Sequence, residues 1–162
     1  MRVIGIDPGT RWTGYGIIDK KGNQLVRVAS GRIKAGTSAV PLPQRLVTIH
    51  DELEAILKVH CPSDGAIEGI FHAKNAMSAL KLGHARGVAM MVLHRHDVEL
   101  MEYPPASVKQ AVTGNGRAKK ETVEQMVRMM LGIRGDLSED ESDALAVAIC
   151  HCNTIQFHRR LR

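Results

Sequence analysis

The chain begins with a short apolar segment that ends in a carboxylate. Residues 3–6 carry only apolar side chains and one glycine, which is typical of a strand buried on both faces. Asp7 follows directly, and Pro8 and Gly9 end the strand there. Asp7 is either a cap of this turn or a metal ligand, and the first strand alone favours neither interpretation.

Two more strands are expected close behind the first. The pattern places them at 15–18 and at about 25–33, joined by a turn at 20–23. Such short connections predict an antiparallel meander. Gly14 and Gly16 weaken the middle strand, so we expect another part of the chain to approach its backbone closely.

The next apolar residues recur at helical spacing and alternate with short strands. A helix at about 46–57 should lead to a strand at 66–68, and a longer helix at 75–96 to a fifth strand at 98–101. A strand reached through a helix is most simply parallel to its neighbour. Glu68 would then end its strand at the same sheet edge as the first strand, and ligand sites in α/β sheets favour that edge.

The second half of the helix at 75–96 is apolar nearly all round, as in a helix that is fully buried or that also forms a subunit contact. Its small residues include Gly83, Ala85, Gly87 and Ala89, which would let another backbone approach closely. Burial within one subunit and a dimer contact both stay open. In the dimer interpretation, Ala89 lies inside the contact.

Three helices are expected in the last third of the chain. Pro104 and Pro105 open the first, since proline is tolerated in a first helical turn, and Gly132 ends the second. The third begins at Ser138, with Glu141 three residues on, as in a capping box. With the five strands, these helices predict an α/β chain whose mixed sheet is flanked by helices.

The last helix carries a second pair of carboxylates. Asp140 and Asp143 are three residues apart and share one helical face. Acids in a first turn complement the helix dipole, but the neighbouring glutamates already do so. The alanines that follow let this helix pack tightly onto the sheet, which favours the interpretation of the pair as ligands aimed at the strand ends.

Four carboxylates are therefore expected to converge, namely Asp7, Glu68, Asp140 and Asp143. They would repel one another strongly without a cation. No histidine or cysteine cluster accompanies them, so the metal should be magnesium or manganese. Two such ions, about 4 Å apart, can activate a water and stabilise a leaving 3′ oxygen, which predicts metal-assisted phosphodiester hydrolysis.

Cations and one aromatic residue accompany these acids. The cations are Arg117, Lys119 and Lys120 behind a glycine-bearing loop at 113–116, and Lys109 one helix earlier. Such a loop either lies against a phosphate backbone or is a solvated surface loop. Phe71, close behind Glu68, either packs in the core or stacks on a base beside the carboxylates.

The composition narrows the class of protein. A length of 162 residues favours one domain, 44% hydrophobic residues argue against disorder, and a net charge of +5 makes an anionic partner plausible. The three cysteines fit no disulfide or zinc pattern, which favours a reducing, cytosolic setting. The first residues read as a strand rather than a signal peptide, and no apolar run approaches the length of a membrane span.

Several short motifs resemble the bacterial RuvC Holliday-junction resolvase family. They lie at 5–9, 13–16, 66–68, 73–76, 78–83, 85–87, 108–110 and 143–146, and the match covers the chain from Arg2 to about Cys152. The resemblance implies an RNase H-like fold with a five-stranded mixed sheet. It also implies a single nuclease domain at 1–157, followed by a basic tail at 158–162.

The same resemblance implies an activity and a set of site residues. The family cuts two opposed strands of a four-way DNA junction symmetrically, as a homodimer that works with a branch-migration helicase complex in recombination and repair. This implies a bacterial, cytoplasmic, nucleoid-associated protein that uses two magnesium ions, with manganese as a substitute. The family's acidic tetrad falls on Asp7, Glu68, Asp140 and Asp143, its stacking phenylalanine on Phe71, and its two catalytic-site lysines on Lys109 and Lys120.

Two rival classes fit part of the pattern. The stretch at 7–10 also resembles the first phosphate loop of actin-like and sugar-kinase ATPases, but those need two such domains, and 162 residues leave no room for them. A junction-binding module without activity would account for the basic charge but not for the four acids. Within the nucleases, a simple RNase H is the nearest alternative, and its RNA–DNA hybrid substrate distinguishes it.

Overall fold

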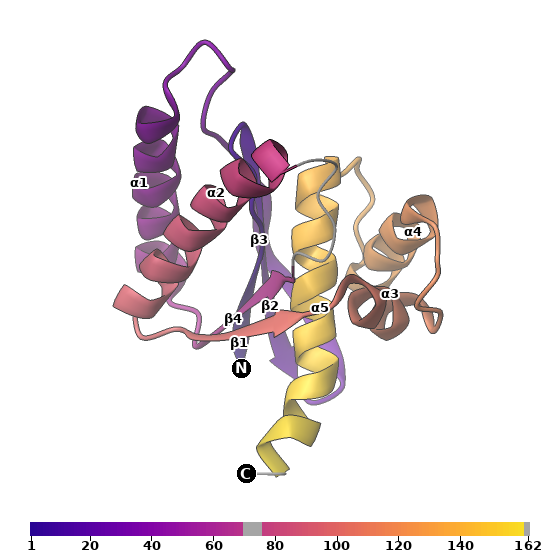
Figure 1. Cartoon of the computed structure of the whole chain (residues 1–162). Coiled ribbons are helices and arrows are strands. Elements are labelled where there is room, and N and C mark those ends of the chain that lie inside the picture. Colours follow the sequence, from indigo (N-terminus) through magenta and orange to yellow (C-terminus); the bar gives the residue numbers. More distant parts are fainter. Residues whose placement is uncertain (70–75, 161–162) are drawn as a thin grey trace.

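The computed structural model describes residues 1–69 and 76–160 (Figure 1). Their strands are β1 (Arg2–Asp7), β2 (Trp12–Lys21), β3 (Gln24–Lys34), β4 (Asp64–Glu68) and β5 (Glu99–Tyr103). Their helices are α1 (Leu42–His60), α2 (Ala76–Arg95), α3 (Pro105–Thr113), α4 (Lys120–Leu131) and α5 (Glu139–Arg160). Phe71 and Asn75 lie outside the described residues, so the interpretation of Phe71 stays a prediction.

The strands form one mixed sheet in the order β3-β2-β1-β4-β5. β1, β2 and β3 are antiparallel neighbours, and β4 and β5 run parallel to β1. This confirms the expected fold class, three antiparallel strands followed by parallel ones. β2 extends beyond the expected 15–18 at both ends, because it pairs with β3 along its whole length, polar residues included.

Helices cover both faces of this sheet. Figure 1 shows α1 and α2 on one side and α5, with α3 and α4 beside it, on the other. Side chains alternate along β1, so that Ile4 and Ile6 pack with α1 and α2, whereas Val3 packs with α5. Each face therefore has its own apolar cluster.

Helix α5 lies directly on the backbones of β1 and β2. A Cβ atom added at Gly5 would overlap with the carbonyl oxygen of Ala144, and one at Gly14 with that of Asp140. At Gly16, an added Cβ would lie 2.6 Å from a methyl carbon of Leu145. The expectation of a close backbone approach at Gly14 and Gly16 is confirmed, and the approaching segment is α5.

The small residues of α2 face two different ways. Ala85 and Ala89 are fully buried in the cluster that α1 and α2 form on the sheet. An added Cβ at Gly83 or Gly87 would meet open space. The expectation that Ala89 lies in a subunit contact is therefore wrong, because the alanine row packs inside the subunit and only the glycine row stays exposed.

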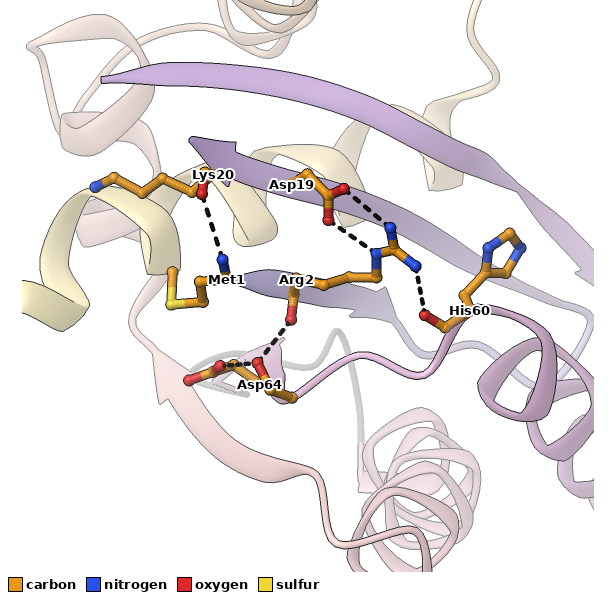
Figure 2. Close-up of polar contacts among 7 residues, drawn as sticks. Met1, Arg2, Asp19, Lys20, His60 and Asp64 are labelled. Carbon is orange, nitrogen blue, oxygen red and sulfur yellow. Dashed lines mark hydrogen bonds and ion pairs between the residues drawn. The ribbon is translucent and has the colours of Figure 1, made fainter. Parts of the chain in front are cut away.

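Polar contacts tie the elements together at the edge of the sheet where β1 begins (Figure 2). The Arg2 guanidinium donates to both carboxylate oxygens of Asp19, at 2.8 and 2.9 Å, and to the carbonyl oxygen of His60 at 2.8 Å. Deeper inside, the buried His151 contacts the Tyr103 hydroxyl through Nδ1 at 3.0 Å and Asp64 through Nε2 at 3.4 Å. The two contacts of His151 join α5 to β4 and β5.

The described residues include no helix that is long and apolar enough to cross a membrane.

The close docking of α5 predicts a large cost for one added methyl group. Gly5→Ala should lower the free energy of unfolding by about 1–3 kcal/mol or more, because the helix must move away from β1. Chemical unfolding at fixed pH measures this. Gly135→Ala is the control, since its Cβ would meet open space. Equal stability of the two variants would contradict the tight docking.

Candidate active site

Asp7 and Glu68 are the last residues of two neighbouring parallel strands. Ile6 of β1 pairs with Ile67 of β4, so the two acids that follow lie side by side. Both point to the α5 face, because alternation along β1 puts Val3, Gly5 and Asp7 on one side. The expected adjacency of these two carboxylates is confirmed.

The first turn of α5 brings the second acidic pair to the same edge. Gly14 is the register partner of Asp7, and its missing side chain leaves room for the backbone of Asp140. Asp143 lies one turn further along α5, close enough for its charge to act on both Asp7 and Glu68. The four predicted acids therefore converge.

The start of α5 differs in one detail from a full capping box. The Ser138 hydroxyl accepts a hydrogen bond from the backbone N–H of Glu141 at 3.4 Å, as expected. The Glu141 carboxylate turns instead to β3, where it accepts hydrogen bonds from Ser30 at 2.5 Å and Arg27 at 3.2 Å. These contacts hold the acidic end of α5 against the sheet.

Two lysines line the cleft in front of the acids. The Lys120 ammonium donates to Asp143 Oδ2 at 2.7 Å and also to Glu139. The cleft has a volume of about 270 Å³ and is lined by Glu68, Pro105, Val108, Lys109, Lys120, Val123, Asp143 and Ala146. Lys109 and Lys120 both act electrostatically on Glu68, so the structure brings the two predicted lysines to the predicted acids.

Asp7, Glu68 and Asp143 hold their protons unusually tightly. Burial, followed by the charges of Asp143, Asp140 and Glu68, raises the pKa of Asp7 to about 8. Burial is also the main cause that raises the pKa of Glu68 and the pKa of Asp143. At neutral pH the site therefore takes up either a proton or another positive charge.

The pKa of Lys120 is raised too, but for a different reason. Burial alone would lower the pKa of its ammonium, but the hydrogen bonds to Asp143 and Glu139 outweigh burial and raise it. The side chain therefore stays charged at neutral pH and offsets part of the negative charge of the cleft.

The donor set of this cleft fits a hard divalent cation. Its candidate ligands are carboxylate oxygens, and the described residues that line the cleft include neither histidine nor cysteine. Within residues 1–69 and 76–160, no three His, Cys, Asp or Glu side chains are placed so that they could hold one ion together. Asp143 is bonded to Lys120, and Asp140 lies 4.0 Å from Arg32, so these carboxylates would have to turn inward.

The two other predicted cations, Arg117 and Lys119, closely precede Lys120 in the chain. Arg117 and Lys119 are exposed just before α4, of which Lys119 is the N-cap residue. Their loop is ordered by Gln110, whose side chain donates to the Gly114 carbonyl at 2.8 Å and accepts from the Gly116 N–H at 3.0 Å. A DNA contact for Arg117 and Lys119 stays a prediction.

Sequence reasoning missed Trp12 and Arg32 as neighbours of the site. The Arg32 guanidinium lies over the Trp12 ring, with its central carbon 4.1 Å from the ring centroid. Counting back from the hairpin pair Lys21–Gln24 would place Arg32 on the opposite face. A register shift next to Ile17 moves it to the α5 face, where it pairs with Gly14. No local sequence signal marks that shift.

Comparisons with known proteins agree with this geometry. A family model described as crossover junction endodeoxyribonuclease RuvC matches residues 3–151. The chain belongs to the RuvC family. A RuvC protein of Syntrophotalea carbinolica is 54% identical over 153 residues, which cover 94% of each chain. The family is one of nucleases, and its chemistry implies dependence on a divalent metal.

Solved structures add the fold. T. thermophilus RuvC, in a complex with a Holliday junction substrate, superposes with a TM-score of 0.92 at 31% identity and covers 98% of this chain and 96% of its own. The yeast mitochondrial resolvase Ydc2 has a TM-score of 0.67 at 14% identity, over 98% of this chain and 82% of its own, and shares the fold. The RNase H-like fold expected for this RuvC chain is confirmed.

The raised pKa of Asp7 predicts how the metal-free protein responds to pH. The raised pKa keeps the Asp7 proton in the folded state up to about pH 8, whereas the unfolded chain releases it near the ordinary aspartate pKa of 3.8. This contribution to stability is complete at low pH and is lost as pH rises between these two values. In chelator, Asp7→Asn should therefore exceed the wild type in unfolding free energy at pH 8 by at least about 1 kcal/mol.

Chemical unfolding from pH 5 to pH 8.5 measures this difference. Asp136→Asn removes an exposed carboxylate just before α5 and should follow the wild type. Parallel pH curves for the wild type and Asp7→Asn would contradict the raised pKa of Asp7.

Proposed function

We propose that this chain is a structure-selective endodeoxyribonuclease that resolves four-way DNA junctions by two symmetric nicks, in recombination and repair. The observation that carries the proposal is the convergence of four carboxylates on the ends of β1, β4 and α5, with a half-buried Asp7 at their centre. The junction as substrate is supported by the family and by the relative in complex with a Holliday junction.

Asp7, Glu68, Asp140 and Asp143 would hold magnesium, two ions in each site, with manganese as a substitute. When bound, such ions activate a water and stabilise the leaving 3′ oxygen. Asp7 has the central place among the ligands, since the other three acids all act on its charge. The raised pKa values of Asp7, Glu68 and Asp143 fit this role, because a cation would take the place of a proton on these three carboxylates.

The chain's own cations position the phosphate. Lys120 and Lys109 line the same cleft as Glu68 and Asp143, and would stabilise the negative charge that accumulates as the phosphodiester breaks. Lys120 is held by Asp143 and Glu139, so its ammonium is already in place before DNA binds. Arg117 and Lys119 extend the positive surface and would contact the backbone. Phe71 is the residue that would stack on a base.

Two symmetric nicks need two active sites related by a two-fold axis, and we infer a homodimer. An exposed row on α2 is the surface that fits it: Met77, Leu80, Gly83, Gly87 and Met91 recur at three- and four-residue spacing. Met77 and Leu80 are 61% and 58% exposed, and the two glycines leave room for a second helix.

The cellular setting is proposed from the family alone. A branch-migration helicase complex would move the junction to the nuclease. A bacterial cytoplasm with the nucleoid close by is the matching location. The whole of residues 1–157 would act as one nuclease domain, with 158–162 as a basic tail.

Asp7→Asn tests the chemistry. The wild type should nick a synthetic four-way junction at paired positions with magnesium and without ATP. Asp7→Asn should bind the same junction within about threefold of wild-type affinity, while its single-turnover cleavage rate falls by at least about 10³-fold, because a central ligand charge is lost but not its bulk. Gel-shift and single-turnover assays measure the two effects.

Substrate controls separate the rivals. A linear duplex and an RNA–DNA hybrid of the same sequence should be cut far more slowly than the junction. Preference for the hybrid would identify an RNase H instead. An Asp7→Asn protein that loses binding but cuts whatever DNA remains bound would contradict the assignment of Asp7.

Leu80→Glu tests the dimer surface. A charge in the middle of the exposed row should split the dimer without unfolding the subunit, because Leu80 is 58% exposed. Sedimentation at micromolar concentration should then give a monomer that nicks one strand but no longer makes paired cuts. Val59→Glu on α1 is the matched control, since Val59 is an apolar residue exposed at 75%, and this variant should stay dimeric. A monomeric wild type that makes paired cuts at full rate would refute the dimer.

A further inference from the structure

Trp12 carries two cations beside the acidic site. It is the single tryptophan of the chain and opens β2, directly after the loop that follows Asp7. The Arg32 guanidinium carbon lies 4.1 Å from its ring centroid, and the Lys34 ammonium 5.7 Å. Arg32 and Lys34 belong to β3, on the side of the site opposite to the Lys109 and Lys120 cleft.

The loop that supports Trp12 is firmly held. The buried Thr13 hydroxyl donates to the Gly9 carbonyl at 2.8 Å, and Arg45 of α1 donates to the Thr10 carbonyl at 3.0 Å. The Arg11 carbonyl accepts from the backbone N–H of Ala35, directly after β3, also at 3.0 Å. The indole is therefore a fixed platform rather than a side chain on a loose loop.

The cations on this platform are available to a ligand. Arg32 faces Asp140 at 4.0 Å with 46% of its side chain exposed, and such surface pairs contribute little to stability. Lys34 is exposed as well. Lys120 on the other side differs, since it donates to two carboxylates at once. An anion would therefore displace Arg32 from its acid more easily than Lys120.

We propose that Trp12, Arg32 and Lys34 form a second phosphate-binding subsite, which holds the DNA backbone on the β3 side of the acidic site. This inference rests on the proposed nuclease function and extends it to the neighbours of the scissile phosphate. A DNA strand that crosses the acids carries phosphates on both sides of the cut. If Lys109 and Lys120 were the only cations of the site, the phosphates on the β3 side would face carboxylates alone. The indole holds the planar guanidinium by a cation–π contact and leaves its edge free for phosphate oxygens.

Arg32→Gln tests the subsite through the salt dependence of binding. One lost phosphate contact should lower the slope of log affinity against log salt by about 0.9, so that a rise from 50 to 200 mM salt weakens the variant about 3.5-fold less than the wild type. Four-way junction binding in chelator, where no cutting occurs, measures this slope. Lys21→Gln is the matched control, since Lys21 is an exposed cation at the other end of β2, and it should keep the wild-type slope.

Trp12 provides an independent signal. Because it is the single tryptophan, its emission reports on this subsite alone. Junction DNA should change the emission of the wild type, and the change should shrink in Arg32→Gln but not in Lys21→Gln. An unchanged slope in Arg32→Gln, or an emission that responds to an acidic polyglutamate peptide but not to DNA, would overturn the proposal.

The two proposals fail separately. If the wild type cuts junctions while Arg32→Gln keeps the full salt slope, the subsite is wrong and the nuclease function stands. If the wild type binds DNA with an Arg32-dependent slope but never cuts a junction with magnesium, the subsite is upheld as a DNA contact and the proposed function is wrong.

Discussion

The contact of α5 with the bare backbones of β1 and β2 determines both the fold and the site. Gly5 and Gly16 are register partners, so side chains are missing at two adjacent points under the helix. Gly14 extends the gap to the place opposite Asp7. The same absence of side chains that lets the helix dock therefore brings Asp140 and Asp143 into the field of Asp7. A substitution that moves α5 away from the sheet would therefore weaken the core and, at the same time, move Asp140 and Asp143 away from Asp7.

The electrostatics of the site are unequal on its two sides. Lys120 is fixed between Asp143 and Glu139, and Lys109 lies near Glu68, so the α3–α4 side is already partly neutralised. The β3 side depends on Arg32, which is exposed and lies 4.0 Å from Asp140. Asp7 lies between these two sides. Its pKa is raised because the nearby cations do not fully balance burial and the charges of the other carboxylates.

Much of this arrangement could be predicted from residues that act locally. Proline and glycine mark where several helices begin and end. β1 and β4 each end in an acid, and because a helix precedes β4, the two strands were expected to run parallel and to bring both acids to one edge of the sheet. Which face of α2 is buried could not be read, because its alternating small residues fit both sides of an apolar helix. The position of Arg32 depended on a register shift between β2 and β3, and strand register is set by the whole sheet rather than by nearby residues.

That register shift also affects how the protein behaves in a crowded solution. β3 is eleven residues long and stands at the end of the strand order, where no other strand among the described residues pairs with its outer edge. Long edge strands invite pairing with another molecule. Val28 is the extra residue that the shift leaves between Arg27 and Ala29. Such a bulge twists the edge strand, which hinders pairing with a strand of another molecule. One inserted residue therefore both protects the sheet from aggregation and turns Arg32 toward the acids.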